Sequence, residues 1–88
     1  MVIVFSSRFE LEIRQIHSFI ANDSLGRANA FIEKIIDKIM LLKTYPNLGR
    51  IVNEDIRELI YKKYVIPYHI SNDTIVILGI YKRNIWKV

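Results

Sequence analysis

The chain has 88 residues, which fits a single domain, and 51% of them are apolar, which excludes a disordered chain. It contains no cysteine, so disulfide cross-links and thiolate metal sites are excluded. The net charge is +4, and the excess lies in residues 56–88, which contain six Lys and Arg residues and two acidic residues. This asymmetry indicates an anionic partner, nucleic acid or an acidic protein, with a solubilising basic surface as the alternative.

The N-terminal residues predict a strand followed by a helix. The β-branched run "VIVF" (2–5) is typical of a strand. Ser7 and Glu10 have the spacing of a capping box, in which each side chain satisfies a free backbone N–H at the helix start. The helix ends near residue 22, and its apolar stripe consists of Phe9, Ile13, Ile16 and Ile20, flanked by Phe19.

A second helix follows, capped by Asn22, Asp23 or Ser24. Its apolar residues spread over about half of the circumference, which is wider than one packing face needs. The surplus could pack on the first helix or bind a partner. The apolar residues of this helix are Ala28, Phe31, Ile32, Ile35, Ile36, Ile39, Met40 and Leu42. The segment "YPNLGR" (45–50) ends the helix, because Tyr45 precedes a proline and Gly49 permits a positive φ.

The last third predicts a β-meander. Its strands are "IRELIY" (56–61), "YVIPYHI" (64–70) and "IVILGIY" (75–81), joined by turns at "KK" (62–63) and "SNDT" (71–74). Pro67 cannot donate a ladder hydrogen bond, so it predicts an edge position or a bulge. The third strand is apolar on both faces and is therefore expected to be central.

The predicted order is β-α-α-β-β-β, and residues 1–88 form one domain. Consecutive helices followed by consecutive strands predict the α+β class, with a helical hairpin packed on one face of a small antiparallel sheet. We expect the first strand to lie beside the last. No apolar run approaches the about 18 residues of a membrane span, and the N-terminal segment is too short and too soon charged for a signal peptide. A cytoplasmic protein without a membrane partner is expected.

Few residues offer catalytic chemistry. His17 and His69 are far apart in the sequence and neither neighbours an acid, so no metal site is expected. The three glycines are isolated and form no phosphate loop. We therefore expect no cofactor and no small-molecule substrate.

Cations and aromatic residues are the remaining candidates, because cations neutralise phosphates and aromatic rings stack on bases. In a meander, Arg57, Tyr68 and Lys82 could converge from three adjacent strands. The alternative is structural: the turn lysines are solvated and the tyrosines complete the edge of the core. The candidate residues for binding a target or nucleic acid are Arg57, Lys62, Lys63, Lys82, Arg83, Trp86 and Lys87.

In order and spacing, several segments between residues 9 and 83 resemble the RelE/ParE superfamily of toxins from bacterial type II toxin–antitoxin systems. They are "FELEIRQIHSFIA" (9–21), "RANAFIEKIIDKIMLLKTYPNLGR" (27–50), "IREL" (56–59), "YVIPY" (64–68) and "NDTIVILGIYK" (72–82), followed by Arg83. The resemblance implies a small toxin that an acidic cognate antitoxin neutralises by covering the helical hairpin and a basic groove. The antitoxin-binding residues expected from it are Phe31, Ile36, Met40, Arg57 and Arg83.

The two branches of this superfamily differ in their targets. RelE-type toxins cut mRNA on the ribosome without a metal, and the residues here that could serve such a nuclease are Arg57, Tyr64, Tyr68, Lys82 and Arg83. ParE-type toxins inhibit DNA gyrase and lack that set. Val65 replaces an arginine of the nuclease pattern, and Ile56 and Glu58 stand where that pattern has paired lysines. The nuclease pattern also has a C-terminal tyrosine that moves a proton, which Trp86 cannot do.

These departures favour a ParE-like toxin that inhibits gyrase. The first alternative is a ribosome-dependent mRNA endonuclease. The second is a non-toxic relative that only binds an antitoxin or nucleic acid.

Overall fold

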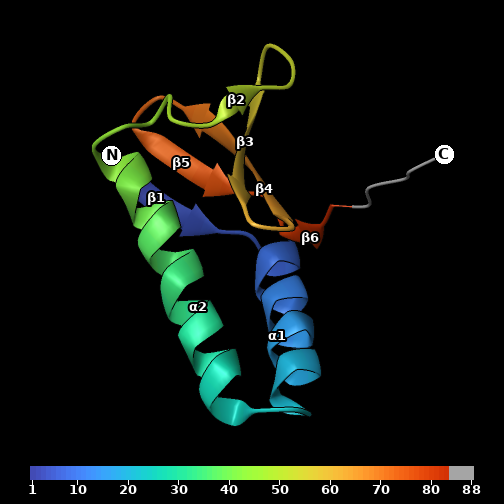
Figure 1. The fold of residues 1–88 in the computed structure, drawn as a ribbon. Helices are drawn as coiled ribbons and strands as arrows, with labels where there is room; N and C mark the ends of the chain where they lie inside the picture. The colour runs from blue at the N-terminus through green and yellow to red at the C-terminus, as the bar shows by residue number, and fades with distance from the viewer. Residues whose placement is uncertain (84–88) are drawn as a thin grey trace, which may run out of the picture.

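A computed structural model describes residues 1–83, so Trp86 and Lys87 lie outside the described part of the chain. Two helices lie side by side and pack against a sheet (Figure 1). The elements are β1 (Val2–Phe5), α1 (Ser7–Ala21), α2 (Leu25–Met40), the 3-10 turn η1 (Leu41–Lys43), β2 (Arg50–Ile51), β3 (Ile56–Tyr61), β4 (Tyr64–Ser71), β5 (Thr74–Ile77) and β6 (Tyr81–Lys82).

The sheet has the strand order β1-β5-β4-β3-β2, and β6 also pairs with β4. As expected, the first strand lies beside the last long one, with Val2 opposite Thr74 and Phe5 opposite Ile77. The pairing is parallel, however, so the expectation of a purely antiparallel sheet was wrong. The chain between β1 and β5 contains both helices and the meander, and a connection of this length allows a parallel neighbour.

Serine residues cap both helices. Ser6, and not Ser7, is the N-cap of α1, because its backbone is extended while Ser7 is already helical. The Ser6 Oγ accepts a hydrogen bond from the Phe9 N–H at 3.0 Å. In α2, the Ser24 Oγ accepts one from the Arg27 N–H at 3.1 Å.

The core lies between the helices and one face of the sheet. Residues that alternate along the strands meet apolar residues from both helices, which confirms the α+β class with the helical hairpin on one face. The buried cluster consists of Phe9, Ile35, Ile39, Leu42, Leu59, Ile66, Tyr68, Ile75, Ile77 and Ile80. Both helices of residues 1–83 pack on this face, and the opposite face of the sheet is called the outer face below.

Pro67 lies at a bulge, as expected. Tyr68 pairs with Ile77 and Val65 pairs with Tyr81, so two residues of β4 oppose three residues between β5 and β6. The Pro67 carbonyl accepts a hydrogen bond from the Leu78 N–H at 2.9 Å. Because the N–H and C=O of one residue point to the same side of a strand, the N–H that proline lacks would have faced this irregular side.

Both predicted hairpin turns are present. Lys62 and Asn72 each begin a turn with a positive φ, 53° and 54° respectively. Gly49 does not use the positive φ that glycine permits. A glycine is needed there because a Cβ would lie 2.7 Å from the Glu58 carbonyl oxygen and 2.6 Å from the Tyr68 ring.

Candidate functional site

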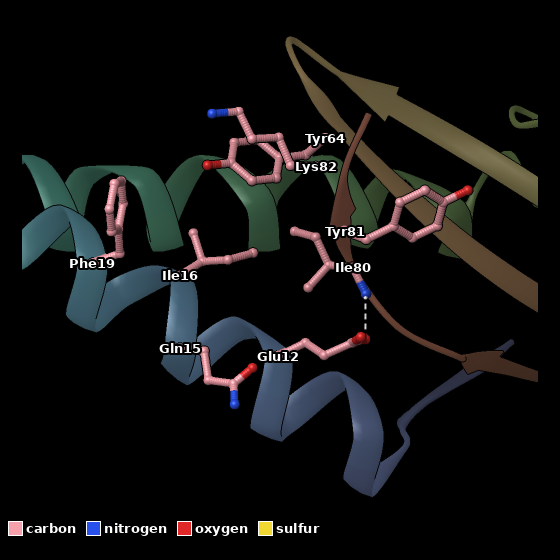
Figure 2. Close-up of a pocket in the computed structure, with 8 residues that line it drawn as sticks. All are labelled: Glu12, Gln15, Ile16, Phe19, Tyr64, Ile80, Tyr81 and Lys82. Carbon is pink, nitrogen blue, oxygen red and sulfur yellow. Dashed lines mark hydrogen bonds between the residues drawn. The ribbon is translucent and has the colours of Figure 1, made fainter. Parts of the chain in front are cut away.

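An open groove of about 340 Å³ lies between α1 and β6 (Figure 2). We call it the α1–β6 groove. Its walls are mostly apolar, and Phe19 on its rim is 74% exposed. Lys82 extends over the groove beside Tyr64, its pairing partner on β4. The lining residues are Glu12, Gln15, Ile16, Phe19, Tyr64, Ile80, Tyr81 and Lys82. An exposed apolar hollow with a cation at its edge is suited to an apolar segment of a protein partner that carries an acid.

The N-cap of α1 and one side chain of the helix hold the segment that leads into β6. Glu12 Oε1 accepts a hydrogen bond from the Ile80 N–H at 3.1 Å, drawn as a dashed line in Figure 2. Ser6 Oγ donates to the Leu78 carbonyl at 2.9 Å. Gly79 makes room for Glu12, because a Cβ there would lie 2.5 Å from Glu12 Oε1. The start of α1 therefore fixes the position of β6 and its cations.

Replacing Glu12 by alanine should destabilise the protein by about 1–2 kcal/mol, because the part-buried Ile80 N–H loses its acceptor. Glu12→Gln is the matched control, since it keeps an acceptor oxygen at the same reach. Chemical denaturation gives the stability, and amide exchange at Ile80 gives the local effect. Equal exchange rates in Glu12→Ala and the unchanged protein would show that Glu12 does not hold β6.

Several of the expected target-binding cations do come together. Lys62 and Lys63 form the β3–β4 turn, and Lys82 and Arg83 lie alongside, because the Arg83 N–H donates to the Lys63 carbonyl. All four residues are exposed. Lys62 Nζ lies 5.5 Å from the centre of the Tyr61 ring. The turn and β6 together therefore present a basic cluster at the end of the α1–β6 groove.

Arg57 and Tyr68 lie elsewhere, so the expected convergence with Lys82 does not occur. They pair with each other across β3 and β4, whereas Lys82 pairs with Tyr64, about 13 Å further along β4 at the usual rise per strand residue. Arg57 Nη1 donates to the carbonyls of Asn47 and Gly49, at 3.2 and 2.8 Å. Its guanidinium holds the loop before β2.

Tyr68 also holds that loop. Its hydroxyl donates to the Pro46 carbonyl at 2.7 Å and accepts from the Gly49 N–H at 2.9 Å. The side chain is fully buried. A buried hydroxyl with both partners in the protein is not placed to reach an RNA, as a residue of a nuclease site must.

The environment of Tyr68 predicts an alkaline loss of stability. Burial raises the pKa of its hydroxyl above the usual 10.0, while the Gly49 N–H and the Arg57 charge act in the opposite direction. The folded state then holds the proton more tightly than the unfolded state, so the stabilisation is full below pH 10 and is lost as the pH rises above it.

Tyr68→Phe should flatten this alkaline decrease in the free energy of unfolding. Burial and Glu58 also raise the pKa of Tyr81. The free energy of unfolding of Tyr81→Phe is therefore followed over the same pH range, for comparison with Tyr68→Phe. Urea titrations between neutral pH and the alkaline range measure how steeply the free energy of unfolding of each variant falls with pH. An identical slope in Tyr68→Phe and the unchanged protein would contradict the assignment.

The outer face of the sheet carries an acid at its centre. Tyr81 donates to Glu58 Oε2 at 3.1 Å, and Arg50 Nη2 donates to Glu58 Oε1 at 2.9 Å. This network links β6, β3 and β2. Val65, on the same face, is buried. Glu58 already binds Arg50, so the pair adds no net positive charge for a phosphate, and the apolar Val65 offers a phosphate no hydrogen bond.

The wide apolar arc of α2 is mostly used inside the protein. Phe31 packs edge-on against the rings of Tyr61 and Tyr64, with centroids 6.5 and 4.9 Å apart. Ile36 is half-buried, and Met40 is 39% exposed. Of the three residues expected to bind an antitoxin on α2, Met40 is therefore the most accessible.

The histidines make structural contacts. His17 Nε2 lies 2.9 Å from Asn29 Oδ1 and links the two helices, and His69 Nδ1 lies 2.8 Å from the Asp55 carbonyl. Within residues 1–83, no group of His, Asp and Glu side chains is arranged to hold a metal ion. None of the helices in that range is long and apolar enough to cross a membrane.

Sequence reasoning missed three features of this site. The two-residue β2, the Glu58 network and the role of Glu12 all depend on contacts between distant segments. One signal was available for the groove: Phe19 flanks the apolar stripe of α1 without belonging to it. A large apolar residue off the packing stripe indicates a surface that binds something else.

Together, the helical hairpin, the mixed sheet and the basic cluster define an α+β fold of the RelE/ParE type. The model of one family, the "ParE toxin of type II toxin-antitoxin system, parDE", matches residues 3–85. The chain belongs to this ParE toxin family.

Comparison with solved structures supports the same fold. The chain is similar to a structure described as "Chromosomal ParDE TA system from P. aeruginosa", with a TM-score of 0.83 and 16% sequence identity. The likeness covers 96% of this chain and 97% of the other. A search of curated protein sequences finds no match.

Proposed function

We propose that this ParE-family toxin inhibits DNA gyrase in the cytoplasm and is neutralised by a cognate antitoxin encoded with it. The observation that carries the choice of target is the paired Glu58 on the outer face. In the related nucleases, cations surround the scissile phosphate. By the resemblance, Glu58 stands where that pattern has one of its paired lysines, and its carboxylate is held by Arg50 and Tyr81, which favours inhibition by binding over catalysis.

Two of the nuclease candidates support the same choice. Tyr68 is buried and Arg57 is bonded to two loop carbonyls. Lys82 and Arg83 remain exposed, but they lie at the far end of β4 from these two residues. Arg57 and Tyr68 therefore cannot act on the same phosphate as Lys82 and Arg83, since catalytic groups must lie within hydrogen-bond reach of the reacting atoms.

The α1–β6 groove is the proposed binding site for the antitoxin's apolar side chains. Ile16 and Phe19 line one wall, and Tyr64 and Ile80 line the other. Lys82 can pair with an acid of the bound segment. Burying exposed Phe19 is favourable, by about 25 cal/mol for each Å² of apolar surface removed from water.

Expression of the toxin alone in bacteria separates the possible functions. Inhibition of gyrase should induce the DNA-damage response and leave broken chromosomal DNA. Cleavage of mRNA at codon-defined positions, with intact DNA, would instead identify a ribosome-dependent endonuclease. Normal growth at confirmed expression would identify a non-toxic relative and refute both toxic functions.

A further inference from the structure

A second groove lies between the N-terminal half of α2 and the β3–β4 turn, and has a volume of about 280 Å³. We call it the α2–β3 groove. Arg27 and Lys34 line it from α2, Lys62 lines it from the turn, and none of its lining residues is acidic. All three cations are exposed. The ion pairs within residues 1–83 involve other residues, so no acid of that range pairs with these three cations.

The charges of α2 are segregated around the helix axis. At about 100° per residue, Arg27 and Lys34 lie within about 20° of each other, on the stripe that faces the β3–β4 turn. The acids Glu33 and Asp37 lie at least about 60° further round the helix. The α2 cations therefore extend the basic surface beyond residues 56–88, where the excess charge of the sequence lies.

The α2–β3 groove continues into the basic cluster of the turn and β6. Phe31, between the two α2 cations, packs against Tyr64 with ring centroids 4.9 Å apart. Tyr64 pairs with Lys82, which extends beside it (Figure 2). Cations from α2, the turn and β6 therefore form one connected surface, which we call the basic face. It consists of Arg27, Lys34, Lys62, Lys63, Lys82 and Arg83.

The composition of the basic face indicates what it binds. Four of its six cations are lysines. Lysine is depleted in interfaces between proteins, because its compact ammonium group holds water strongly. Contacts to the phosphate backbone of nucleic acids use lysine and arginine alike. A surface of exposed lysines without interleaved acids therefore favours a phosphate backbone over an acidic protein.

The aromatic rings of the groove indicate which form of nucleic acid fits. Lys62 Nζ lies 5.5 Å from the centre of the Tyr61 ring, and Phe31 packs edge-on against that ring. Stacking of unpaired bases needs an open ring face, whereas these rings already have partners in the protein. A duplex presents its phosphates and needs no stacking. The arrangement therefore favours a duplex over a single strand.

Lys62 occupies its place against the preference of its backbone. Its φ of 53° lies in the left-handed region, where glycine and asparagine are favoured. The equivalent position of the other hairpin does hold an asparagine, Asn72, with a φ of 54°. A strained position that keeps a lysine points to a role for its side chain.

We propose that the basic face binds the phosphate backbone of duplex DNA without contacting the bases. Arg27 and Lys34 lie about 10 Å apart along α2, at about 1.5 Å per residue. A duplex carries one charge for about every 1.7 Å of its axis, so each of the two cations meets a phosphate of its own. Duplex binding stands on these charges and contacts alone. That the duplex is the DNA held by gyrase rests on the proposed function.

The test measures binding of the purified toxin to a short, fluorescently labelled duplex of mixed sequence, without gyrase. Fluorescence anisotropy should give a dissociation constant of about 10⁻⁶ to 10⁻⁴ M at physiological salt, the range of sequence-independent binding. The logarithm of the association constant should fall with that of the salt concentration, with a slope of up to about 5 in magnitude, because each neutralised phosphate contributes about 0.9. Oligothymidylate and polyglutamate, the comparison ligands, should bind more weakly.

Two variants test the residues of the basic face. Arg27→Gln with Lys34→Gln should lower the magnitude of the salt slope by about 1.8 and weaken duplex binding more than about tenfold. Lys62→Asn should lower the magnitude by about 0.9 without lowering the melting temperature, because asparagine is favoured at this φ. Arg14→Gln with Lys43→Gln removes the charge of the first variant from exposed positions outside both grooves and should keep the slope.

Four results would overturn the proposal. The duplex fails to bind even at low salt, or oligothymidylate binds more tightly, which would assign the face to single strands. Polyglutamate binds more tightly, which would assign it to an acidic protein. The control pair lowers the slope as much as the α2 pair, which would show that only the overall charge matters. Gyrase inhibition is measured separately, so a toxin that inhibits gyrase but binds no duplex would overturn this proposal alone.

Discussion

Replacing Gly49 by alanine is expected to destabilise the protein by about 2–4 kcal/mol. Overpacking in a tight site costs about 1–3 kcal/mol, and loss of the hydrogen bond from the Gly49 N–H to the Tyr68 hydroxyl adds about 1 kcal/mol. The new Cβ would lie 2.7 Å from the Glu58 carbonyl oxygen, which is backbone and cannot rotate away. For a domain stabilised by about 5–15 kcal/mol, this is a large fraction.

Urea denaturation of the Gly49→Ala variant measures this loss. Gly26→Ala is the matched control, because its Cβ would have only the Ser24 Oγ nearby, at 3.8 Å. Gly26 lies in α2, where alanine should stabilise the helix by up to about 1 kcal/mol. If the two variants shift the denaturation midpoint equally, the close approach of Gly49 to Tyr68 and Glu58 does not limit stability.

Replacing Lys82 and Arg83 together by alanine is expected to abolish growth inhibition while the fold remains intact. Both residues are exposed, and neither belongs to the buried cluster. They contribute two of the cations at the end of the α1–β6 groove, where an anionic surface of the target would approach. The loss of two charges from one cluster should slow and weaken this association.

Growth after induced expression measures the effect, and circular dichroism checks the fold. Arg14→Ala with Lys43→Ala removes the same charge from exposed positions outside both grooves and should stay toxic. Full toxicity of the Lys82→Ala, Arg83→Ala protein would remove the basic cluster from the mechanism.

Most of the fold could be predicted from local patterns. Both helices, β1, β3, β4 and both hairpin turns follow from apolar periodicity and turn residues, and β3 matches its predicted bounds of 56–61. The strand predicted over 75–81 is instead divided into β5 (Thr74–Ile77) and β6 (Tyr81–Lys82). The parallel orientation of β1 could not be predicted, because it depends on where the long connection returns. The cap at Ser6 was missed since two serines are adjacent and the backbone decides between them.

The candidate site was less accessible to sequence reasoning. The cations of the β3–β4 turn and β6 were found, because the excess charge of the chain is concentrated there. The grooves were not, since each joins residues that are distant in sequence, as Glu12 and Ile80 show. Arg57 and Tyr68 were assigned to function from residue type alone, whereas their partners in the 46–49 loop give them a structural role.

The central claim is that this chain inhibits gyrase by binding. The most direct measurement combines purified toxin, DNA gyrase, ATP and relaxed plasmid DNA, with a parallel reaction of toxin, programmed ribosomes and mRNA. We predict loss of supercoiling and accumulation of cleaved DNA after detergent and protease treatment, while the mRNA stays intact. Unaffected gyrase together with mRNA cut on the ribosome would contradict the account.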